Sequence, residues 1–369
     1  MAKKAAARLK RGVAAGRGDH RSRPLAETAD FGPNPGGLRM WSYTPPAVGP
    51  KPALVVVLHG CTQTAQAYAD GAGWLTLADR YGFVVLCPEQ VGANNPNGCF
   101  NWFLAEDQQR GRGEAASIHA MVQACVRQHR IDQGRIFVTG LSAGGAMASV
   151  MLAAYPETFA GGGVVAGLPY GAAETMPAAF GAMFQCIPKD GGALGDKVRA
   201  ASGHRGPWPR VSVWHGGADH TVVPANGDEV AKQWADVHGA SPEGDVHMAG
   251  RVRSSWAVDG ETMVELHRLG GLAHGTPLSS RGEDGCGAPG PFLIEAGVSS
   301  SLEMLKFWGL AESRLIELDM EAPPPEAEVI HPVWRTVETP APNNLPGLGA
   351  DIEAVITKAL RSAGLMPPR

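Results

Sequence analysis

From about residue 38 to residue 310, stretches that are apolar at every position alternate with stretches whose apolar residues recur every three or four positions. The runs "LVVVL" (Leu54–Leu58) and "FVVL" (residues 83–86) contain no polar residue, which is typical of strands buried on both faces of a sheet. In Glu114–His129 the apolar residues fall on one face of a helix. Strands that alternate with helices predict an α/β fold, with a mostly parallel sheet covered by helices on both faces.

The pattern also predicts where the elements lie. Strands are expected at Leu54–Leu58, Phe83–Cys87, Arg135–Thr139, Gly163–Ala166, Arg210–Trp214 and Thr262–Leu269. Helices are expected at Trp74–Tyr81, Glu114–His129, Ala143–Tyr155, Asn226–His238 and Ser299–Trp308.

Three segments follow from this pattern. Residues 1–35 are expected to form a basic, flexible arm, and residues 36–310 one α/β domain. Prolines interrupt helices and strands, and they are frequent after about residue 310. Residues 311–369 are therefore interpreted as a Pro-rich strap on or near the domain, with a short helix at Asp351–Ala363.

Charge is distributed unevenly along the chain. The net charge is −4, but the first 23 residues hold eight basic residues and one acid, which leaves 24 basic and 35 acidic residues for the rest. An acidic body argues against nucleic acid as a partner. No run approaches about 18 apolar residues, so no membrane span is expected. The arm lacks the apolar core of a secretion signal, which favours a cytoplasmic location. The oligomeric state is left open.

None of the six cysteines is spaced as CxxC, so no metal site is expected, and the sequence indicates no cofactor.

A candidate catalytic residue is a serine that lies between two glycines, where a predicted strand becomes a predicted helix. Gly140-Leu141-Ser142-Ala143-Gly144 fits the pattern G-x-S-x-G, which carries weight because of this context. Such a turn strains the serine backbone, and its flanking glycines avoid clashes. The next helix's N-terminus favours developing negative charge. Ser142 is therefore the candidate nucleophile.

A serine nucleophile needs a base, and the base needs an acid that orients it. The chain order in this arrangement is serine, acid, histidine. Asp219 lies in the loop after the strand Arg210–Trp214, and His274 lies in "GGLAHG" after the strand Thr262–Leu269, so they are the candidate acid and base. The other histidines lie beside the acid, at a helix end, in a strand or in stretches without a suitable pattern: His220, His238, His247, His267 and His331.

The negative oxygen that forms during ester cleavage needs N–H donors. One is expected from Ala143, directly after the nucleophile. The other is expected from Cys61, in the loop "HGCT" that follows the strand Leu54–Leu58. His59 begins this loop and is interpreted as bracing it, not as a second base.

Several motifs together resemble the polyhydroxybutyrate depolymerase family of α/β-hydrolases, which is related to feruloyl and acetylxylan esterases. In chain order they are "LHGCTQTAQAYADGAGW", "PEQ", "NPNGCFNWF", "RGRGE", "GLSAGGAMA", "GLPYGAA" and "HGGADHTVVPANG", and they span about residues 50–310. The resemblance implies an α/β-hydrolase fold, with Ser142, Asp219 and His274 as the triad and the Cys61 and Ala143 amides as the oxyanion hole.

The resemblance also bears on cysteines and substrate contacts. The family pattern suggests a Cys61–Cys99 disulfide, and Cys186–Cys286 is a second candidate pair. Trp102 is implied in the substrate cleft, where we also place His59, although Trp102 could instead fill the core. The chain departs from secreted polymer depolymerases because it shows no signal peptide, linker or polymer-binding domain, and "AHGTPL" around His274 lacks a Trp found nearby in many relatives.

The sequence thus predicts a metal-free serine esterase that acts on short hydroxyalkanoate oligomers or small acyl esters through an acyl-enzyme. A feruloyl or acetyl carbohydrate esterase is the alternative within enzymes. A catalytically inactive binding or scaffold protein is the alternative from another class, and the Ser142, Asp219 and His274 set counts against it.

Overall fold

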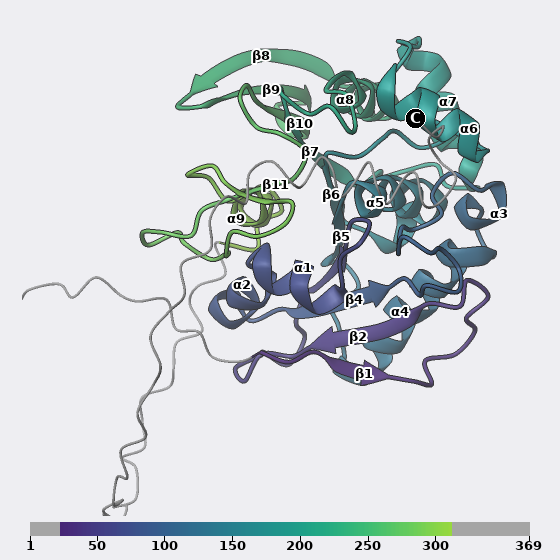
Figure 1. Cartoon of the computed structure of the whole chain (residues 1–369), viewed down its shortest axis with the longest axis vertical. Helices are drawn as coiled ribbons and strands as arrows, with labels where there is room; N and C mark the ends of the chain where they lie inside the picture. The colour runs from purple at the N-terminus through teal and green to yellow at the C-terminus, as the bar shows by residue number, and fades with distance from the viewer. Residues whose placement is uncertain (1–22, 312–369) are drawn as a thin grey trace, which may run out of the picture.

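A mixed ten-stranded sheet organises the computed structural model, which describes residues 23–311 (Figure 1). The strands from β4 to β10 in this order run parallel, and the two outer strands on each side are antiparallel to their neighbours. The order is β1 (Ala26–Thr28), β2 (Arg39–Tyr43), β4 (Val84–Glu89), β3 (Leu54–Leu58), β5 (Ile136–Leu141), β6 (Gly161–Val165), β7 (Arg210–Gly216), β10 (Glu261–Leu269), β9 (Arg251–Val258) and β8 (Ser241–Met248). A separate two-stranded sheet joins β11 (Thr276–Leu278) and β12 (Leu293–Glu295).

Both faces of the central strands are buried, as their continuous apolar runs predict. In β3, Leu54, Val56 and Leu58 belong to one core, while Val55 and Val57 belong to the other. Burying each such side chain contributes about 1.5–3 kcal/mol. The second core contains α1 (Ala65–Gly71), α2 (Trp74–Tyr81) and α9 (Ser300–Phe307). The first core contains α4 (Gly113–His129), α5 (Ala143–Ala154), α6 (Met176–Phe184), α7 (Gly191–Ala201) and α8 (Ala225–His238).

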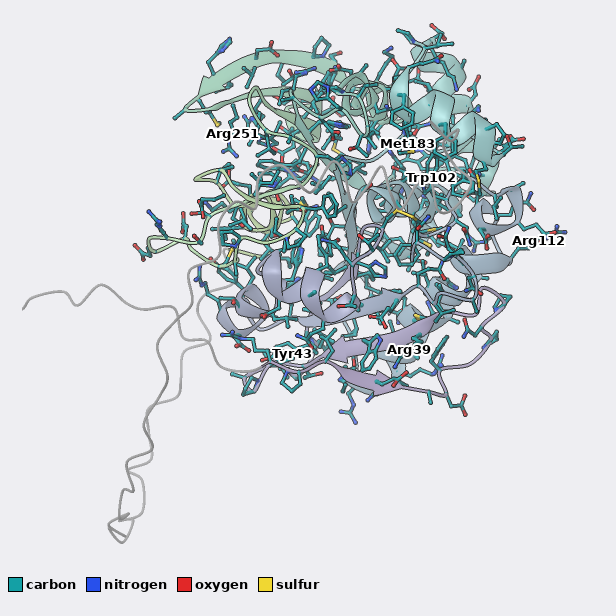
Figure 2. All side chains as sticks on the ribbon, viewed as in Figure 1. Arg39, Tyr43, Trp102, Arg112, Met183 and Arg251 are labelled. Atoms are coloured by element: carbon teal, nitrogen blue, oxygen red, sulfur yellow. A yellow bond between two sulfur atoms is a disulfide. The ribbon has the colours of Figure 1, made fainter. Side chains whose placement is uncertain are left out.

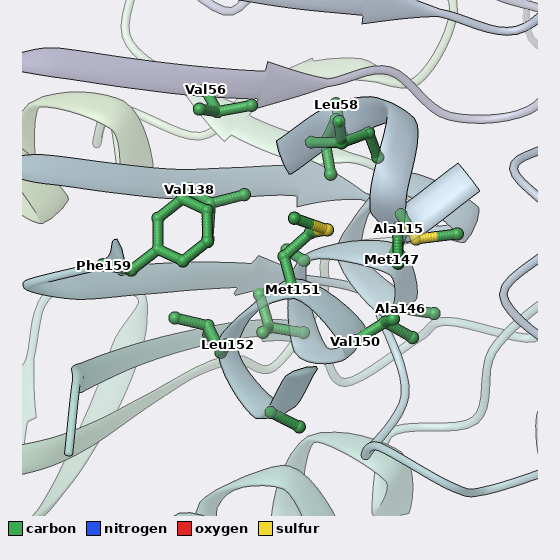
Figure 3. Packing of buried hydrophobic residues seen from close by; sticks show 14 of the residues in the cluster. Val56, Leu58, Ala115, Val138, Ala146, Met147, Val150, Met151, Leu152 and Phe159 are labelled. Carbon is green, nitrogen blue, oxygen red and sulfur yellow. The ribbon is translucent and has the colours of Figure 1, made fainter. Parts of the chain in front are cut away.

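Helix α5 lies deepest of these, and all of its residues are buried. Its methionines and small residues pack against strand side chains such as Val56 and Val138 (Figure 3). Small residues allow a close approach: a Cβ added to Gly145 would lie 2.9 Å from the Val165 carbonyl oxygen of β6. The Ala- and Gly-rich composition therefore brings the helix after Ser142 directly onto the sheet.

The predicted α/β fold with a mostly parallel sheet is confirmed, and each strand and helix expected between residues 38 and 310 is present, with ends shifted by at most two residues. The pattern missed the two outer strands on each side of the sheet, and also β11, β12, α1, α3 (Ala105–Gln108), α6, α7 and the short 3₁₀ helix Pro156–Thr158. Strand β8 shows why: all of its residues are exposed, and it contains Pro242 and Gly244, which disfavour strands. It forms because β9 offers it hydrogen-bonding partners.

The expected arm was too long at its C-terminal end. Residues 23–35 belong to the folded domain, since β1 pairs with β2 and the Arg23 guanidinium lies 2.6 Å from the Asp79 carboxylate. The remaining arm, the strap and its predicted helix Asp351–Ala363 lie outside the described residues. Within residues 23–311, no helix has both the length and the apolar character that crossing a bilayer requires.

Candidate active site

Four loops that follow parallel strands meet at the carboxyl edge of the sheet. Ser142 follows β5, Asp219 follows β7, His274 follows β10 and Cys61 follows β3. Parallel strands end at the same edge, so residues far apart in sequence come together there. The His274 Nε2 atom lies 2.9 Å from the Ser142 Oγ atom, and His274 Nδ1 lies 2.7 Å from Asp219 Oδ2. The structure thus brings together the three residues that the sequence analysis selected as a triad.

The backbone of Ser142 is strained, with φ at 57° and ψ at −118°. Gly140 and Gly144 make this turn possible: a Cβ on Gly140 would lie 2.4 Å from the Gly144 carbonyl carbon, and one on Gly144 would lie 2.2 Å from the Leu58 oxygen. The Ser142 N–H donates to the Val165 carbonyl at 2.9 Å, which holds the turn on β6. Strain of this kind persists only where the surroundings over-determine the conformation.

Asp219 is buried and held by several donors. Its Oδ1 accepts hydrogen bonds from the Thr221 and Val222 amides, each at 2.9 Å, which leaves Oδ2 facing His274. Burial acts to raise the pKa of Asp219, but hydrogen bonds from His215, His274 and the Val222 amide outweigh it and hold the pKa well below its usual range. The carboxylate is therefore ionised at neutral pH, and His274 Nδ1 carries the proton between them.

The loop of His274 is docked on the loop of Asp219. The Gly217 N–H donates to the Leu269 oxygen at 2.7 Å, and the Ala218 N–H donates to the Leu272 oxygen at 3.0 Å. These bonds join the ends of two neighbouring parallel strands. With Nδ1 protonated, His274 Nε2 has its lone pair toward the Ser142 hydroxyl, which is the arrangement that a general base requires.

Two backbone amides near Ser142 are available to a ligand. Neither the Cys61 N–H nor the Ala143 N–H donates a hydrogen bond to another described residue. Beside them lies a cavity of about 70 Å³, lined in part by Cys61, Leu141, Ser142, Met183, His274 and Phe292. Met183 comes from α6 and is labelled in Figure 2. An apolar cavity with unpaired N–H groups beside a serine can hold an acyl group and a developing oxyanion.

Cys61 and Cys99 form a disulfide, which ties the loop after β3 to the loop before α3. Cytosolic proteins rarely keep disulfides. The disulfide therefore weighs against the cytoplasmic location predicted from the arm, and the location stays a prediction. The expected Cys186–Cys286 pair was wrong, because both cysteines are free. Cys186 lies beside α7 and α8, whereas Cys286 belongs to the core on the other face of the sheet.

The two residues expected to contact substrate lie elsewhere. Trp102, which is labelled in Figure 2, is 5% exposed and packs edge-on against Phe103, with ring centroids 5.5 Å apart. It is not among the residues that line the cavity. The Trp102 ring is part of the hydrophobic core. This is the alternative to a substrate contact that the sequence analysis left open. His59 is 1% exposed and also lies outside the cavity lining; its ring braces the loop instead.

Sequence reasoning missed a buried carboxyl group behind the loop of Cys61. Glu114 is 1% exposed, and it accepts hydrogen bonds from the Gln90 side chain and from the backbone and side chain of Asn101. Burial, followed by the nearby charge of Asp107, raises the pKa of Glu114 to about 8. The motifs "PEQ", "NPNGCFNWF" and "RGRGE" each contribute one of these residues, which is the signal that could have found the cluster.

Comparison with known proteins defines the class. The solved structure of the acetyl xylan esterase from Aspergillus awamori matches with a TM-score of 0.67 and 26% sequence identity, over 78% of this chain and 100% of that one. Together with the relatives below, this likeness shows that the protein is a carboxylic ester hydrolase with the α/β-hydrolase fold.

The chain belongs to the esterase PHB depolymerase family, whose sequence model matches residues 39–257. It is 41% identical to poly(3-hydroxyalkanoate) depolymerase C of Paucimonas lemoignei, over 78% of this chain and 70% of the relative. It is 36% identical to the probable acetylxylan esterase A of Neosartorya fischeri, over 58% of this chain and 60% of the relative.

Proposed function

We propose that the protein hydrolyses short hydroxyalkanoate oligomers or small acyl esters through an acyl-enzyme on Ser142. The observation that carries the proposal is the hydrogen-bonded chain from Ser142 Oγ to His274 to Asp219, at 2.9 and 2.7 Å. A catalytically inactive scaffold would have no need of a strained serine beside an aligned base, so this chain weighs against a role in binding alone.

The steps follow from this geometry. His274 Nε2 takes the proton from Ser142 Oγ as the oxygen bonds to the ester carbonyl carbon. The Cys61 and Ala143 amides hold the resulting oxyanion. His274 then gives its proton to the leaving alcohol oxygen as the ester C–O bond breaks. Water, deprotonated by the same imidazole, releases the acid and restores Ser142. Asp219 keeps the imidazole in the required tautomer and stabilises its charged form.

The cavity supports a short acyl group. A water needs about 10–15 Å³, so about 70 Å³ holds roughly five to seven waters. The lining side chains Leu141, Met183 and Phe292 are apolar, which suits a short aliphatic chain better than a bulky aromatic one. A relative named as a poly(3-hydroxyalkanoate) depolymerase agrees with this choice.

Hydrolysis of acetyl esters on carbohydrate is the second candidate. An acetyl group also fits the cavity, and acetylxylan esterases occur among both the sequence relatives and the solved structures. A feruloyl ester is a poorer fit, because its acid carries an aromatic ring.

A series of chromogenic esters of increasing acyl length, with 3-hydroxybutyrate oligomers and acetylated xylan, tests both candidates. The Ser142→Ala variant should lose at least about 10⁴-fold in kcat. Ser149→Ala is the matched control. It removes a buried hydroxyl from the helix after Ser142, and this hydroxyl donates hydrogen bonds only to the Gly145 and Leu168 carbonyls. Retained activity in Ser142→Ala would refute the mechanism. Fastest turnover of acetylated xylan would select the second candidate instead.

A further inference from the structure

A closed ring of contacts surrounds the peptide unit between Gly60 and Cys61. The N–H of this unit belongs to Cys61, the second proposed oxyanion donor, and its carbonyl belongs to Gly60. A peptide unit is planar, so whatever sets the direction of the carbonyl also sets the direction of the N–H. The His59 Nδ1 atom lies 2.8 Å from that carbonyl oxygen.

A neighbouring backbone amide determines which nitrogen of His59 carries the proton. The Gln90 N–H donates to His59 Nε2 at 3.2 Å, so Nε2 is an acceptor and Nδ1 is the donor to the Gly60 carbonyl. Burial lowers the pKa of His59, which keeps the imidazole neutral. With its one lone pair occupied by the Gln90 amide, this ring is a fixed hydrogen-bond donor and not a base.

Four hydrogen bonds hold the Gln90 side chain. Its Nε2 donates to the Cys99 carbonyl at 3.0 Å and to Glu114 Oε1 at 2.5 Å, and its Oε1 accepts from the Val91 amide and from the Asn94 side chain, each at 3.0 Å. Glu114 Oε2 accepts from the Asn101 amide at 2.8 Å, so the carboxyl group binds the Gln90 side chain and the loop of Cys99 at once.

The disulfide closes the ring, because Cys99 is bonded to Cys61. Starting from Cys61, the ring passes through Gly60, His59, Gln90 and Cys99 and returns to Cys61. We propose that His59 is a positioning residue of the oxyanion hole, which aims the Cys61 N–H through the Gly60 carbonyl and is held in turn by Gln90 and Glu114. This inference rests on the proposed function, since it assumes that an oxyanion forms beside Cys61.

A misdirected N–H donor reduces the stabilisation of the transition state more than the binding of the ester, because the full negative charge exists only in the transition state. Removal of one oxyanion donor costs about 10²–10³-fold in kcat. Losing the aim of a donor that is still present should cost less, about 10–100-fold in kcat, with KM changed by less than about threefold.

Two substitutions test the hydrogen bond. His59→Asn is smaller than histidine but keeps an N–H donor near the position of Nδ1, whereas His59→Leu is close to histidine in volume and has no donor. His238→Leu is the matched control, because His238 is a partly buried histidine whose Nε2 binds the Pro209 carbonyl at 3.0 Å, far from the site. We expect His59→Leu to lose about 10–100-fold in kcat, His59→Asn to stay within about fivefold of the wild type, and His238→Leu to keep its kcat.

Inhibition by butylboronic acid provides a readout that a merely structural role would not move. Its tetrahedral adduct on Ser142 places an oxygen at the oxyanion position, so its Ki should weaken in His59→Leu by about the same factor as kcat falls. Equal losses in His59→Leu and His59→Asn, or an unchanged Ki, would overturn the proposal. If neither His59 variant folds, Gln90→Met decides. This variant keeps the backbone N–H that binds His59 but removes the side-chain bonds to Cys99 and Glu114, so kcat should fall about 3–10-fold, and an unchanged kcat would overturn the proposal that Gln90 and Glu114 hold the donor in place. If any of these results overturns the role of His59 while Ser142→Ala has lost its activity, the proposed function is still supported.

Discussion

The two sides of the proposed active site are held in place by different means. On the side of the proposed nucleophile, Ser142, Asp219 and His274 follow the parallel strands β5, β7 and β10, with β6 lying between β5 and β7, and backbone hydrogen bonds hold their loops. On the oxyanion side, Cys61 follows a strand too, but side chains from distant segments hold its loop: His59, Gln90 and Glu114, together with the disulfide. The first side depends on sheet geometry, and the second depends on a polar network inside the fold.

The difference suggests different responses to change. A triad held by its backbone should fail abruptly when one functional group is altered, because Ser142, His274 and Asp219 act as one hydrogen-bonded chain. A loop held by several ties should lose its aim in steps, as each tie is removed. The predictions below test this contrast.

The largest effect is expected from Asp219→Asn. The Thr221 and Val222 amides require an acceptor at the Oδ1 position, so the new amide NH₂ must occupy the Oδ2 position and face His274 Nδ1. Nδ1 then becomes an acceptor, and Nε2 holds a proton where a lone pair is needed. We expect kcat to fall about 10³–10⁴-fold.

The control for this variant is Asp228→Asn, which alters an exposed carboxylate of α8 paired with Arg268. Its kcat should stay within about twofold of the wild type. A loss of less than tenfold in Asp219→Asn, in a protein with a native circular dichroism spectrum, would contradict the assigned role of the acid.

A smaller effect is expected where the two sides meet. A Cβ at Gly144 would lie 2.2 Å from the Leu58 oxygen and 2.5 Å from the His59 oxygen, so Gly144→Ala must push α5 and the oxyanion loop apart. We expect a loss of about 3 kcal/mol in unfolding free energy and about 10²-fold in kcat, measured by denaturant unfolding and steady-state kinetics. Gly181→Ala in α6 is the control, because its Cβ would meet open space, and its stability should be unchanged or slightly raised. Equal unfolding free energies of the two variants would show that the structure accommodates a Cβ at Gly144 with little loss of stability.

The smallest effect on turnover is expected from the double variant Cys61→Ser/Cys99→Ser. The bond closes a loop between residues 38 apart in sequence, so its loss should lower the unfolding free energy by about 2–4 kcal/mol. Since the histidine tie on the Gly60 carbonyl remains, kcat should fall by only about threefold. A reductant should affect the wild type in the same way and leave this double variant unchanged.

Cys186→Ala serves as the control, because Cys186 is free and its removal should leave both kcat and the response to reductant as they are. Combining the double serine variant with His59→Leu sharpens the contrast between the sides. Two ties on one loop should give a combined loss in kcat that differs from the product of the separate losses. A simple product would indicate that the ties act independently.

Sequence reasoning succeeded at the centre of the molecule and failed at its margins. The strands β3, β4 and β5 are buried on both faces, and burial imposes the apolar runs from which they were predicted. Strand β8 has no buried face, so nothing in its composition marks it as a strand. The same contrast explains Trp102, since a sequence shows that an indole is present but not whether the surrounding loop turns it inward or outward.

By itself, the sequence determined the central strands and helices, the strained turn around Ser142, and Asp219 and His274 as its partners, because hydrophobic period, glycine spacing and chain order are local or ordered signals. Only the tertiary structure decided the ring around Cys61, the free state of Cys186 and Cys286, the buried position of Trp102 and the outer strands. The physical reason is that each of these depends on side chains or strand edges brought together from distant segments, whose distances no local pattern records.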